Sequence, residues 1–285
     1  MKPRKSLGQH FLKSRDALRK IIQAGQVSSN DVILEIGPGK GVLTEELLKK
    51  VSPAQNGRGK IIAVEKDREL FEFLRKKFEK EITEKKLILI EGDILDIKTP
   101  SLFEHSPLAG GEETYKIISN IPYNITGAIL KKFLTAGAQS PFAQGFGGAQ
   151  PERMVLLLQK EVAERIMGKR PRRKVGVNKE SILSISVKAY GEPKVIGKVP
   201  RRYFSPEPKV DSAIIAIKNI SREFFNRNDI NEEKFWQIVK KGFAHKRKRL
   251  AGNLKNFIPD AVLAKYSDKR AEDLALDDWI RLASN

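Results

Sequence analysis

The chain has 285 residues, of which 40% are hydrophobic and 7% aromatic, so it can build a packed core and wholesale disorder is excluded. Its 54 Lys and Arg outnumber 35 Asp and Glu, and the net charge of +19 predicts a polyanionic partner, with nucleic acid first and an anionic membrane second. The absence of cysteine excludes disulfides and thiolate metal sites and fits a reducing, cytoplasmic setting.

The sequence gives little support to the membrane alternative or to a metal site. No apolar run approaches the roughly 20 residues that a spanning helix needs. The first six residues are basic, but no apolar signal core follows them. The three histidines show no metal-ligand spacing. We therefore expect no membrane partner and no metal, and we also expect the protein to be a monomer.

Short apolar runs alternate with amphipathic stretches through the first part of the chain, which predicts an α/β fold with a mostly parallel, Rossmann-like sheet and helices on both faces. Two later strand-like runs have no long helix between them, so we expect them to pair antiparallel at a sheet edge. Strands are expected at 32–36, 60–65, 86–91, 115–120, 154–158, 181–189 and 211–217, and helices at 42–51, 69–81, 126–134 and 160–167.

From about residue 220 the pattern becomes helical. Phe235, Ile238, Val239 and Phe243 fall on one helical face, and 271–282 is a second amphipathic stretch. The expected domains are therefore 1–219, which carries the sheet, and an all-helical 220–285. The segments 101–113 and 137–150 are expected to be loops or insertions.

A glycine-rich turn follows the first expected strand. Residues 35–41 read Glu-Ile-Gly-Pro-Gly-Lys-Gly, and glycines here let the backbone bend sharply and approach a ligand. The dinucleotide fingerprint G-x-G-x-x-G/A fails, because counting from Gly37 its sixth position is Val42. The turn instead resembles motif I of class I methyltransferases, in which the loop passes the methionine part of S-adenosylmethionine. A tight βα connection without a ligand is the alternative.

Two carboxylates follow the next expected strands. Glu65 ends the second strand, where a carboxylate can accept hydrogen bonds from both ribose hydroxyls of a nucleotide. Asp93 follows the third strand and is expected to accept from the amino group of a cofactor adenine. Because the carboxyl ends of parallel strands line one crevice, these features together predict a cofactor pocket.

The tetrapeptide Asn-Ile-Pro-Tyr, residues 120–123, follows the fourth expected strand. An adenine N6 amine is a poor nucleophile because its lone pair is delocalised into the ring. The side-chain oxygen of Asn120 and the carbonyl of Ile121 can accept its two hydrogens, which favours an sp3-like nitrogen and stabilises developing positive charge. Tyr123 offers a ring face to a flipped base. The alternative is a turn with a core tyrosine.

In combination, these motifs resemble the small-subunit ribosomal RNA adenine N6-dimethyltransferase family over almost the whole chain. The resemblance also rests on Gly-Gln-His-Phe-Leu at 8–12, on the pattern F-x-P-x-P-x-V-x-S at 204–212, and on the basic stretch 246–254. It implies an S-adenosylmethionine-dependent methyltransferase that places two methyl groups on each of two adjacent adenines near the 3′ end of small-subunit rRNA, in a pre-30S particle.

The same resemblance implies roles for single residues. Phe204 would join Asn120 and Tyr123 in the catalytic set as a second aromatic wall around the target adenine, with a buried phenylalanine before a proline turn as the alternative. The implied cofactor contacts are His10, Leu12, Gly37, Glu65, Asp93 and Asn120. The chain departs from the family pattern in the longer segment 137–150 and in the more basic run 169–174.

Basic residues gather in three places. Residues 240–255 contain seven Lys or Arg and no acidic residue, residues 169–174 contain five more, and a pair precedes Phe204. One charged run is usually a solvated face, but two runs in a chain of this charge favour contact with phosphates. The residues expected to bind RNA are Arg201, Arg202, Lys246, Arg247, Lys248 and Arg249.

Three other functions remain open at the level of sequence. A large-subunit rRNA adenine methyltransferase shares the pocket and the tetrapeptide, although the N-terminal signature and the basic helical region favour the small-subunit enzyme. A DNA adenine or protein glutamine methyltransferase can use a similar tetrapeptide. A non-catalytic nucleic-acid-binding factor in ribosome assembly or transcription is the alternative from another class, and the intact Glu65, Asp93 and 120–123 argue against it.

Overall fold

The computed structural model describes residues 3–4, 7–51, 59–98, 114–135, 150–169 and 179–284. The expected loop at 101–113, residues 137–149 of the expected loop at 137–150, and the basic positions 170–174 lie outside these residues. The chain forms two compact units, one of Met1–Lys160 with Lys194–Ile220 and one of Glu161–Pro193 with Ser221–Asn285. Residues 161–193, which the sequence analysis places in the first domain, are thus grouped with the C-terminal helices. The expected domain boundary between residues 219 and 220 stays a prediction.

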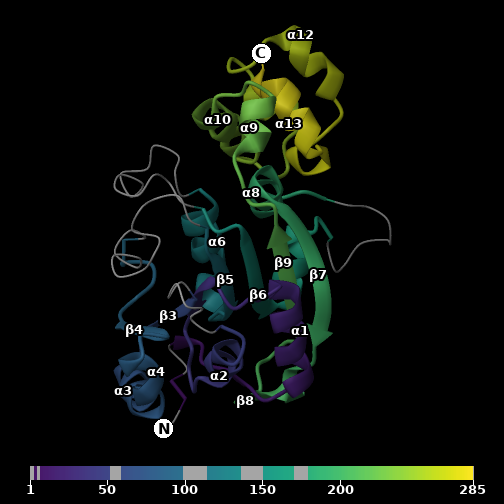
Figure 1. The fold of residues 1–285 in the computed structure, drawn as a ribbon. Helices are drawn as coiled ribbons and strands as arrows, with labels where there is room; N and C mark the ends of the chain where they lie inside the picture. Colours follow the sequence, from purple (N-terminus) through teal and green to yellow (C-terminus); the bar gives the residue numbers. More distant parts are fainter. Residues whose placement is uncertain are drawn as a thin grey trace. The chain divides into compact units, whose positions relative to one another are not determined.

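A seven-stranded sheet forms the centre of the first unit, in the order β4-β3-β2-β5-β6-β9-β7 (Figure 1). The strands from β4 across to β6 pair in parallel, and β9 runs antiparallel to β6. The predicted α/β class is therefore confirmed. The strands are β2 (Val32–Ile36), β3 (Lys60–Glu65), β4 (Leu87–Glu91), β5 (Lys116–Asn120), β6 (Arg153–Gln159), β7 (Glu192–Val199) and β9 (Ser212–Lys218).

The order of the strands reverses beside β2. The chain passes from β2 outward through β3 and β4, then returns to form β5 and β6 on the other side of β2. Connections that leave adjacent strands in opposite directions open a crevice at the carboxyl ends of those strands. The reversal therefore predicts a ligand site where β2 and β5 end.

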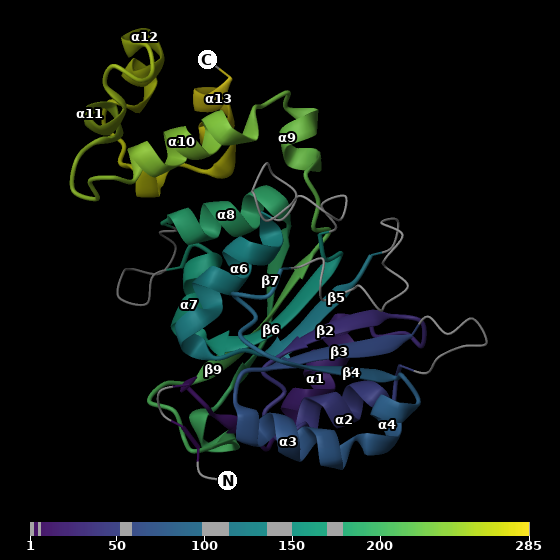
Figure 2. The same cartoon turned by 90° about the vertical axis from the view of Figure 1, so that its left-hand side faces the viewer.

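Helices cover both faces of this sheet, with α1, α2 and α3 on one face and α6 on the other (Figure 2). The side chain of Ser14 caps α1 by accepting from the backbone N–H of Ala17 at 3.2 Å, and Asp67 caps α3 in the same way. The apolar side of α1 packs on the sheet, and Ile21 is fully buried. The helices are α1 (Arg15–Gly25), α2 (Val42–Leu48), α3 (Arg68–Lys77), α4 (Glu79–Thr83) and α6 (Thr126–Leu134).

A two-stranded sheet joins the N-terminal segment to a distant part of the first unit. Strand β1 (Phe11–Leu12) pairs antiparallel with β8 (Phe204–Ser205), and Leu12 lies opposite Phe204. The turn η4 (Arg201–Tyr203) leads into β8, and the N–H of Lys13 donates to the carbonyl of Tyr203 at 2.8 Å. This pairing fixes residues 8–12 beside the crevice.

The second unit is helical. Asn231 caps α10 by accepting from the N–H of Lys234 at 2.9 Å, and its core includes Trp279, which stacks on Phe243. Within the described part of the chain, no helix is both long and apolar enough to cross a membrane. The elements are α7 (Lys160–Ile166, beginning at the boundary), α8 (Ile182–Tyr190), α9 (Glu223–Arg227), α10 (Glu232–Gly242), α11 (Leu250–Leu254), α12 (Asp260–Leu263) and α13 (Leu276–Ala283), with the 3₁₀ turns Ala264–Tyr266 and Ala271–Asp273.

Three expected elements differ in the structure. In place of the strand expected at 181–189, the helix α8 spans Ile182–Tyr190, because Ser181 and Ser184 make a reciprocal capping box that starts a helix. The alternation of serines with aliphatic residues there imitates a strand. The edge strand beside β9 is β7, not residues 181–189. The expected helix at 69–81 divides at Phe78 into α3 and α4, and the stretch 271–282 divides into a 3₁₀ turn and α13.

Candidate active site

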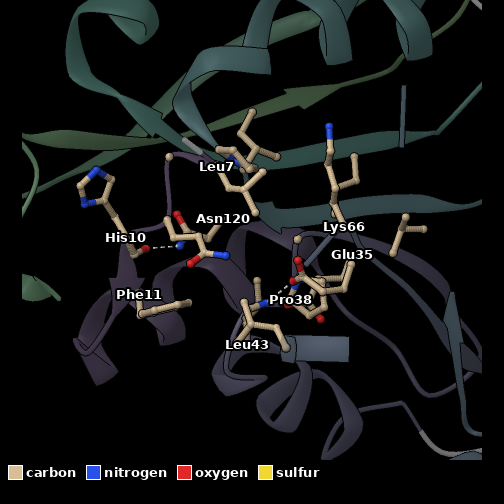
Figure 3. Close-up of a pocket in the computed structure, with 18 of the residues that line it drawn as sticks. Leu7, His10, Phe11, Glu35, Pro38, Leu43, Lys66 and Asn120 are labelled. Atoms are coloured by element: carbon tan, nitrogen blue, oxygen red, sulfur yellow. Dashed lines mark hydrogen bonds between the residues drawn. The ribbon is translucent and has the colours of Figure 1, made fainter. Parts of the chain in front are cut away.

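One cavity lies at the carboxyl ends of the central strands, where the strand order reverses. It is lined by the glycine turn after β2, by the ends of β3 and β4, by residues 120–125 after β5, and by the N-terminal segment 7–12 (Figure 3). All six residues predicted to contact a cofactor line it, namely His10, Leu12, Gly37, Glu65, Asp93 and Asn120. The fold therefore brings together what the sequence scatters over more than a hundred positions.

The glycine turn is held against Glu65. Gly39 has φ +61°, a left-handed conformation that favours glycine, and its N–H donates to Glu65 Oε2 at 3.0 Å. Glu65 Oε1 accepts from the N–H of Asp67 at 2.9 Å. Burial raises the pKa of Glu65, and these backbone donors counter part of that rise. A carboxylate has about four acceptor sites, so Glu65 keeps acceptor capacity for a ligand hydroxyl.

Asp93 is held by two donors at the edge of the same cavity. Its Oδ2 accepts from Lys66 Nζ at 2.6 Å, and its Oδ1 accepts from the N–H of Leu95 at 2.9 Å. Burial alone would raise the pKa of Asp93, but the Lys66 ammonium and the Leu95 N–H together hold it below its usual value. The side chain is thus kept as a charged acceptor.

Asn120 is oriented by the N-terminal segment. Its Nδ2 donates to the backbone carbonyl of His10 at 3.2 Å, which Figure 3 marks with a dashed line. The oxygen Oδ1 is therefore the side-chain atom left to accept a hydrogen bond in the cavity. This is the atom that the sequence analysis expects to accept from an adenine amine, although its role there stays a prediction.

Tyr123 is fixed at both ends. Its hydroxyl shares a hydrogen bond with Ser212 Oγ at 2.6 Å, and its ring stacks with that of His10 at a centroid distance of 5.6 Å and an interplanar angle of 21°. His10 Nδ1 in turn lies 2.8 Å from the carbonyl oxygen of Pro206. Burial raises the pKa of the Tyr123 hydroxyl, so it stays neutral. The contacts with Ser212 and Pro206 were not predicted from the sequence.

Phe204, the third predicted catalytic residue, lies outside the cavity lining. It is 2% exposed and belongs to the hydrophobic core with Leu12 and Ile214, because the β1–β8 pairing draws it inward. The described structure thus matches the buried-phenylalanine alternative for its location, and contact with a target base stays a prediction.

The residues predicted to bind RNA are exposed, in two separate groups. Arg201 pairs with Glu207 at 2.9 Å, and the Arg202 guanidinium lies 5.3 Å from the ring centroid of the exposed Tyr203. In the second unit, Lys246, Arg247, Lys248 and Arg249 are all exposed, and Arg249 pairs with Asp268 at 2.9 Å. Their contact with RNA stays a prediction.

Glu35 is a cavity residue to which the sequence analysis gave no role of its own. It lies in β2, is 1% exposed, and its Oε2 is buried without a hydrogen-bond partner among the described residues. Burial raises the pKa of Glu35 to about 8, with a smaller contribution from the charge of Glu65. An acidic residue inside an otherwise apolar strand (Val-Ile-Leu-Glu-Ile) was the available signal.

This raised pKa predicts a pH-dependent stability. Between the ordinary carboxyl pKa and about 8, the folded protein holds a proton on Glu35 that the unfolded chain has released. Raising the pH across that interval therefore destabilises the ligand-free protein, by about 1.4 kcal/mol per pH unit from this group. Glu35→Gln has no proton to lose, so its unfolding free energy should fall less steeply.

Urea unfolding of both proteins at a series of pH values between about 5 and 8 measures this difference. Glu79→Gln, at an exposed position on α4, is the control and should keep the wild-type slope. Equal slopes in wild type and Glu35→Gln would show that Glu35 titrates normally.

The mostly parallel sheet with its reversed strand order, and the cavity that joins a glycine turn to two strand-end carboxylates, define a class I methyltransferase. The family described as "Ribosomal RNA adenine dimethylase" matches residues 1–284. The chain thus belongs to the ribosomal RNA adenine dimethylase family, and it is a methyltransferase that acts on rRNA adenine.

Similarity to individual relatives supports this assignment. The chain is 38% identical to the ribosomal RNA small subunit methyltransferase A of Rippkaea orientalis, covering 99% of this chain and 97% of that protein. It is 34% identical to the protein of that name from Dehalococcoides mccartyi, covering 99% and 88%. Among solved structures, a dimethyladenosine transferase from Plasmodium falciparum has a TM-score of 0.71 at 26% identity, covering 96% of both chains. The 23S rRNA methyltransferase ErmE shares the fold, with a TM-score of 0.68 at 22% identity, covering 96% of this chain and 98% of that one.

Proposed function

We propose that this protein transfers methyl groups from S-adenosylmethionine to N6 of two adjacent adenines near the 3′ end of small-subunit rRNA, acting as a monomer on a pre-30S particle. The observation that carries the proposal is that Asn120 and Tyr123 share one cavity with Glu65 and Asp93. The relatives named above support the small subunit as the source of the RNA.

The residues present fit an S-adenosylmethionine donor. Glu65 offers carboxylate lone pairs for two ribose hydroxyls, and Asp93 offers a charged acceptor for an adenine amine. Gly37, at φ +66°, leaves room beside Pro122, where a Cβ would lie 3.6 Å from the proline ring. The unpartnered Oε2 of Glu35 supplies a further polar atom on the same wall. When bound, the donor supplies an electrophilic methyl group on a sulfonium.

On this proposal, the protein acts by positioning and electrostatics. Asn120 Oδ1 and the Ile121 carbonyl would accept the two N6 hydrogens, which would free the nitrogen lone pair and aim it at the methyl group that the donor would supply. The methylated amine would be cationic and would lose a proton to water, and the donor would leave as a neutral thioether. The neutral, clamped Tyr123 offers a ring face to the extruded base.

The test is transfer of tritiated methyl groups to 30S particles that lack the modification, followed by digestion to nucleosides. We expect the label in N6,N6-dimethyladenosine. RNase treatment of the particles before the assay should remove the signal. Label on large-subunit RNA, on DNA or on protein under the same conditions would contradict the proposed substrate.

A further inference from the structure

The loop that carries Asp93 is a compact turn. The N–H groups of Asp96 and Ile97 both donate to the carbonyl of Asp93, at 3.0 and 3.1 Å, and the N–H of Leu95 donates to its side chain. Ile94, which follows Asp93, is 3% exposed and lines the cavity. The turn therefore fixes two neighbouring cavity residues at once.

A lysine on a helix later in the chain donates hydrogen bonds to the backbone of this turn. Lys132 lies on α6, the helix that follows the 120–125 segment, and its Nζ donates to the carbonyls of Ile94 at 2.7 Å, of Leu95 at 3.2 Å, and of Ile97. An ammonium has three N–H donors and no acceptor, so these three carbonyls match its whole capacity. Hydrogen bonds from a charged donor are also stronger than neutral ones.

We infer that Lys132 is a positioning residue that holds the 93–97 turn in the shape in which Asp93 and Ile94 receive the adenine end of the cofactor. The inference rests on the proposed function for the identity of that ligand. Because Lys132 and the 120–125 segment belong to the same continuous stretch of chain, the lysine also ties the cofactor side of the cavity to its catalytic side.

Lys132 does not itself line the cavity. Losing it should therefore weaken cofactor binding through the turn, without removing any atom that touches a ligand. The neighbouring Lys131 is exposed, has the same charge and lies on the same helix, so it provides a matched control.

The experiment measures S-adenosylhomocysteine binding by calorimetry for the wild type, Lys132→Met and Lys131→Met. We expect the dissociation constant to rise about tenfold in Lys132→Met, the size expected when a charged hydrogen-bond donor is lost. Lys131→Met should match the wild type. In turnover assays, Lys132→Met should raise KM for S-adenosylmethionine, while kcat at saturation and KM for RNA stay near wild type.

Hydrogen exchange of the ligand-free proteins supplies a readout that is independent of the cofactor. The amides of Leu95, Asp96 and Ile97 should exchange faster in Lys132→Met, with little change in the strands. If Lys132→Met does not fold, Lys132→Gln, which keeps two amide donors, is measured instead and should show smaller changes in the same direction.

Two outcomes would overturn the inference. One is an unchanged dissociation constant in a folded Lys132 variant, and the other is an equal loss in Lys131→Met. Failure of the wild type to bind S-adenosylhomocysteine is a different result, because it would remove the proposed cofactor. In that case, unchanged exchange at 95–97 would also reject the role of Lys132 in holding the turn.

Discussion

Asn120→Ala is expected to abolish measurable methyl transfer while the protein still binds S-adenosylhomocysteine. The substitution removes the Oδ1 acceptor that faces the cavity and the Nδ2 donor that engages the His10 carbonyl. Loss of one preorganised group that stabilises transition-state charge costs about 10²–10³ in kcat, and here the orienting bond is lost as well. Single-turnover transfer to unmodified 30S particles, with calorimetry of cofactor binding on the same sample, measures both effects.

S-adenosylhomocysteine should still bind measurably, because only one of the six predicted cofactor contacts is lost while Glu65, Asp93 and the glycine turn are intact. Asn120→Asp separates the two functions of the amide. It keeps an acceptor oxygen but cannot donate to the His10 carbonyl, so it should retain more activity than Asn120→Ala and less than wild type. Full activity in Asn120→Ala would remove Asn120 from its proposed role.

Replacing Lys246, Arg247, Lys248 and Arg249 together by Gln is expected to lower RNA affinity strongly. All four are exposed, and within the described residues only Arg249 has an acidic partner, Asp268. Each phosphate contact releases condensed counterions, so its loss should lower RNA affinity roughly tenfold at 0.1 M salt and reduce the salt slope by about one. Three or four contacts would therefore lower affinity by about 10³ or more.

Titration of small-subunit rRNA fragments at several salt concentrations measures this slope. The matched control neutralises Arg68, Arg75, Lys76 and Lys80, which are exposed on α3 and α4 and change the net charge equally. If affinity depends only on the overall charge of the protein, the two variants will behave alike. An unchanged salt slope in the first variant would reject residues 246–249 as an RNA surface.

The N-terminal segment has a more direct part in the site than its sequence motif suggests. The β1–β8 pairing holds His10 so that its carbonyl engages Asn120 while its ring lies against Tyr123. One short segment thus contacts both Asn120 and Tyr123 of the predicted catalytic set. A motif expected to contact the cofactor therefore also sets the orientation of the side chains that face the base.

The sequence alone determined the features that depend on neighbours in the chain. The strand β3 and the helix α6 were predicted with their observed bounds, since apolar periodicity is a local property of the chain. The glycine turn, Glu65 and Asp93 were assigned to one crevice correctly, because strand ends in a parallel sheet share an edge.

Only the tertiary structure decided features that depend on distant partners. The helix at residues 182–190 is an exception, because the Ser181–Ser184 cap that starts it is local and was overlooked in favour of the strand-like pattern. Phe204 is buried in the core because β8 pairs with β1. Glu35 is buried because its strand, β2, lies between β3 and β5 in the sheet. Lys132 donates hydrogen bonds to three carbonyls on a turn that precedes it by some 35 residues. Burial and hydrogen bonding of this kind arise when remote segments pack together, and no local pattern of residues encodes which segments will meet.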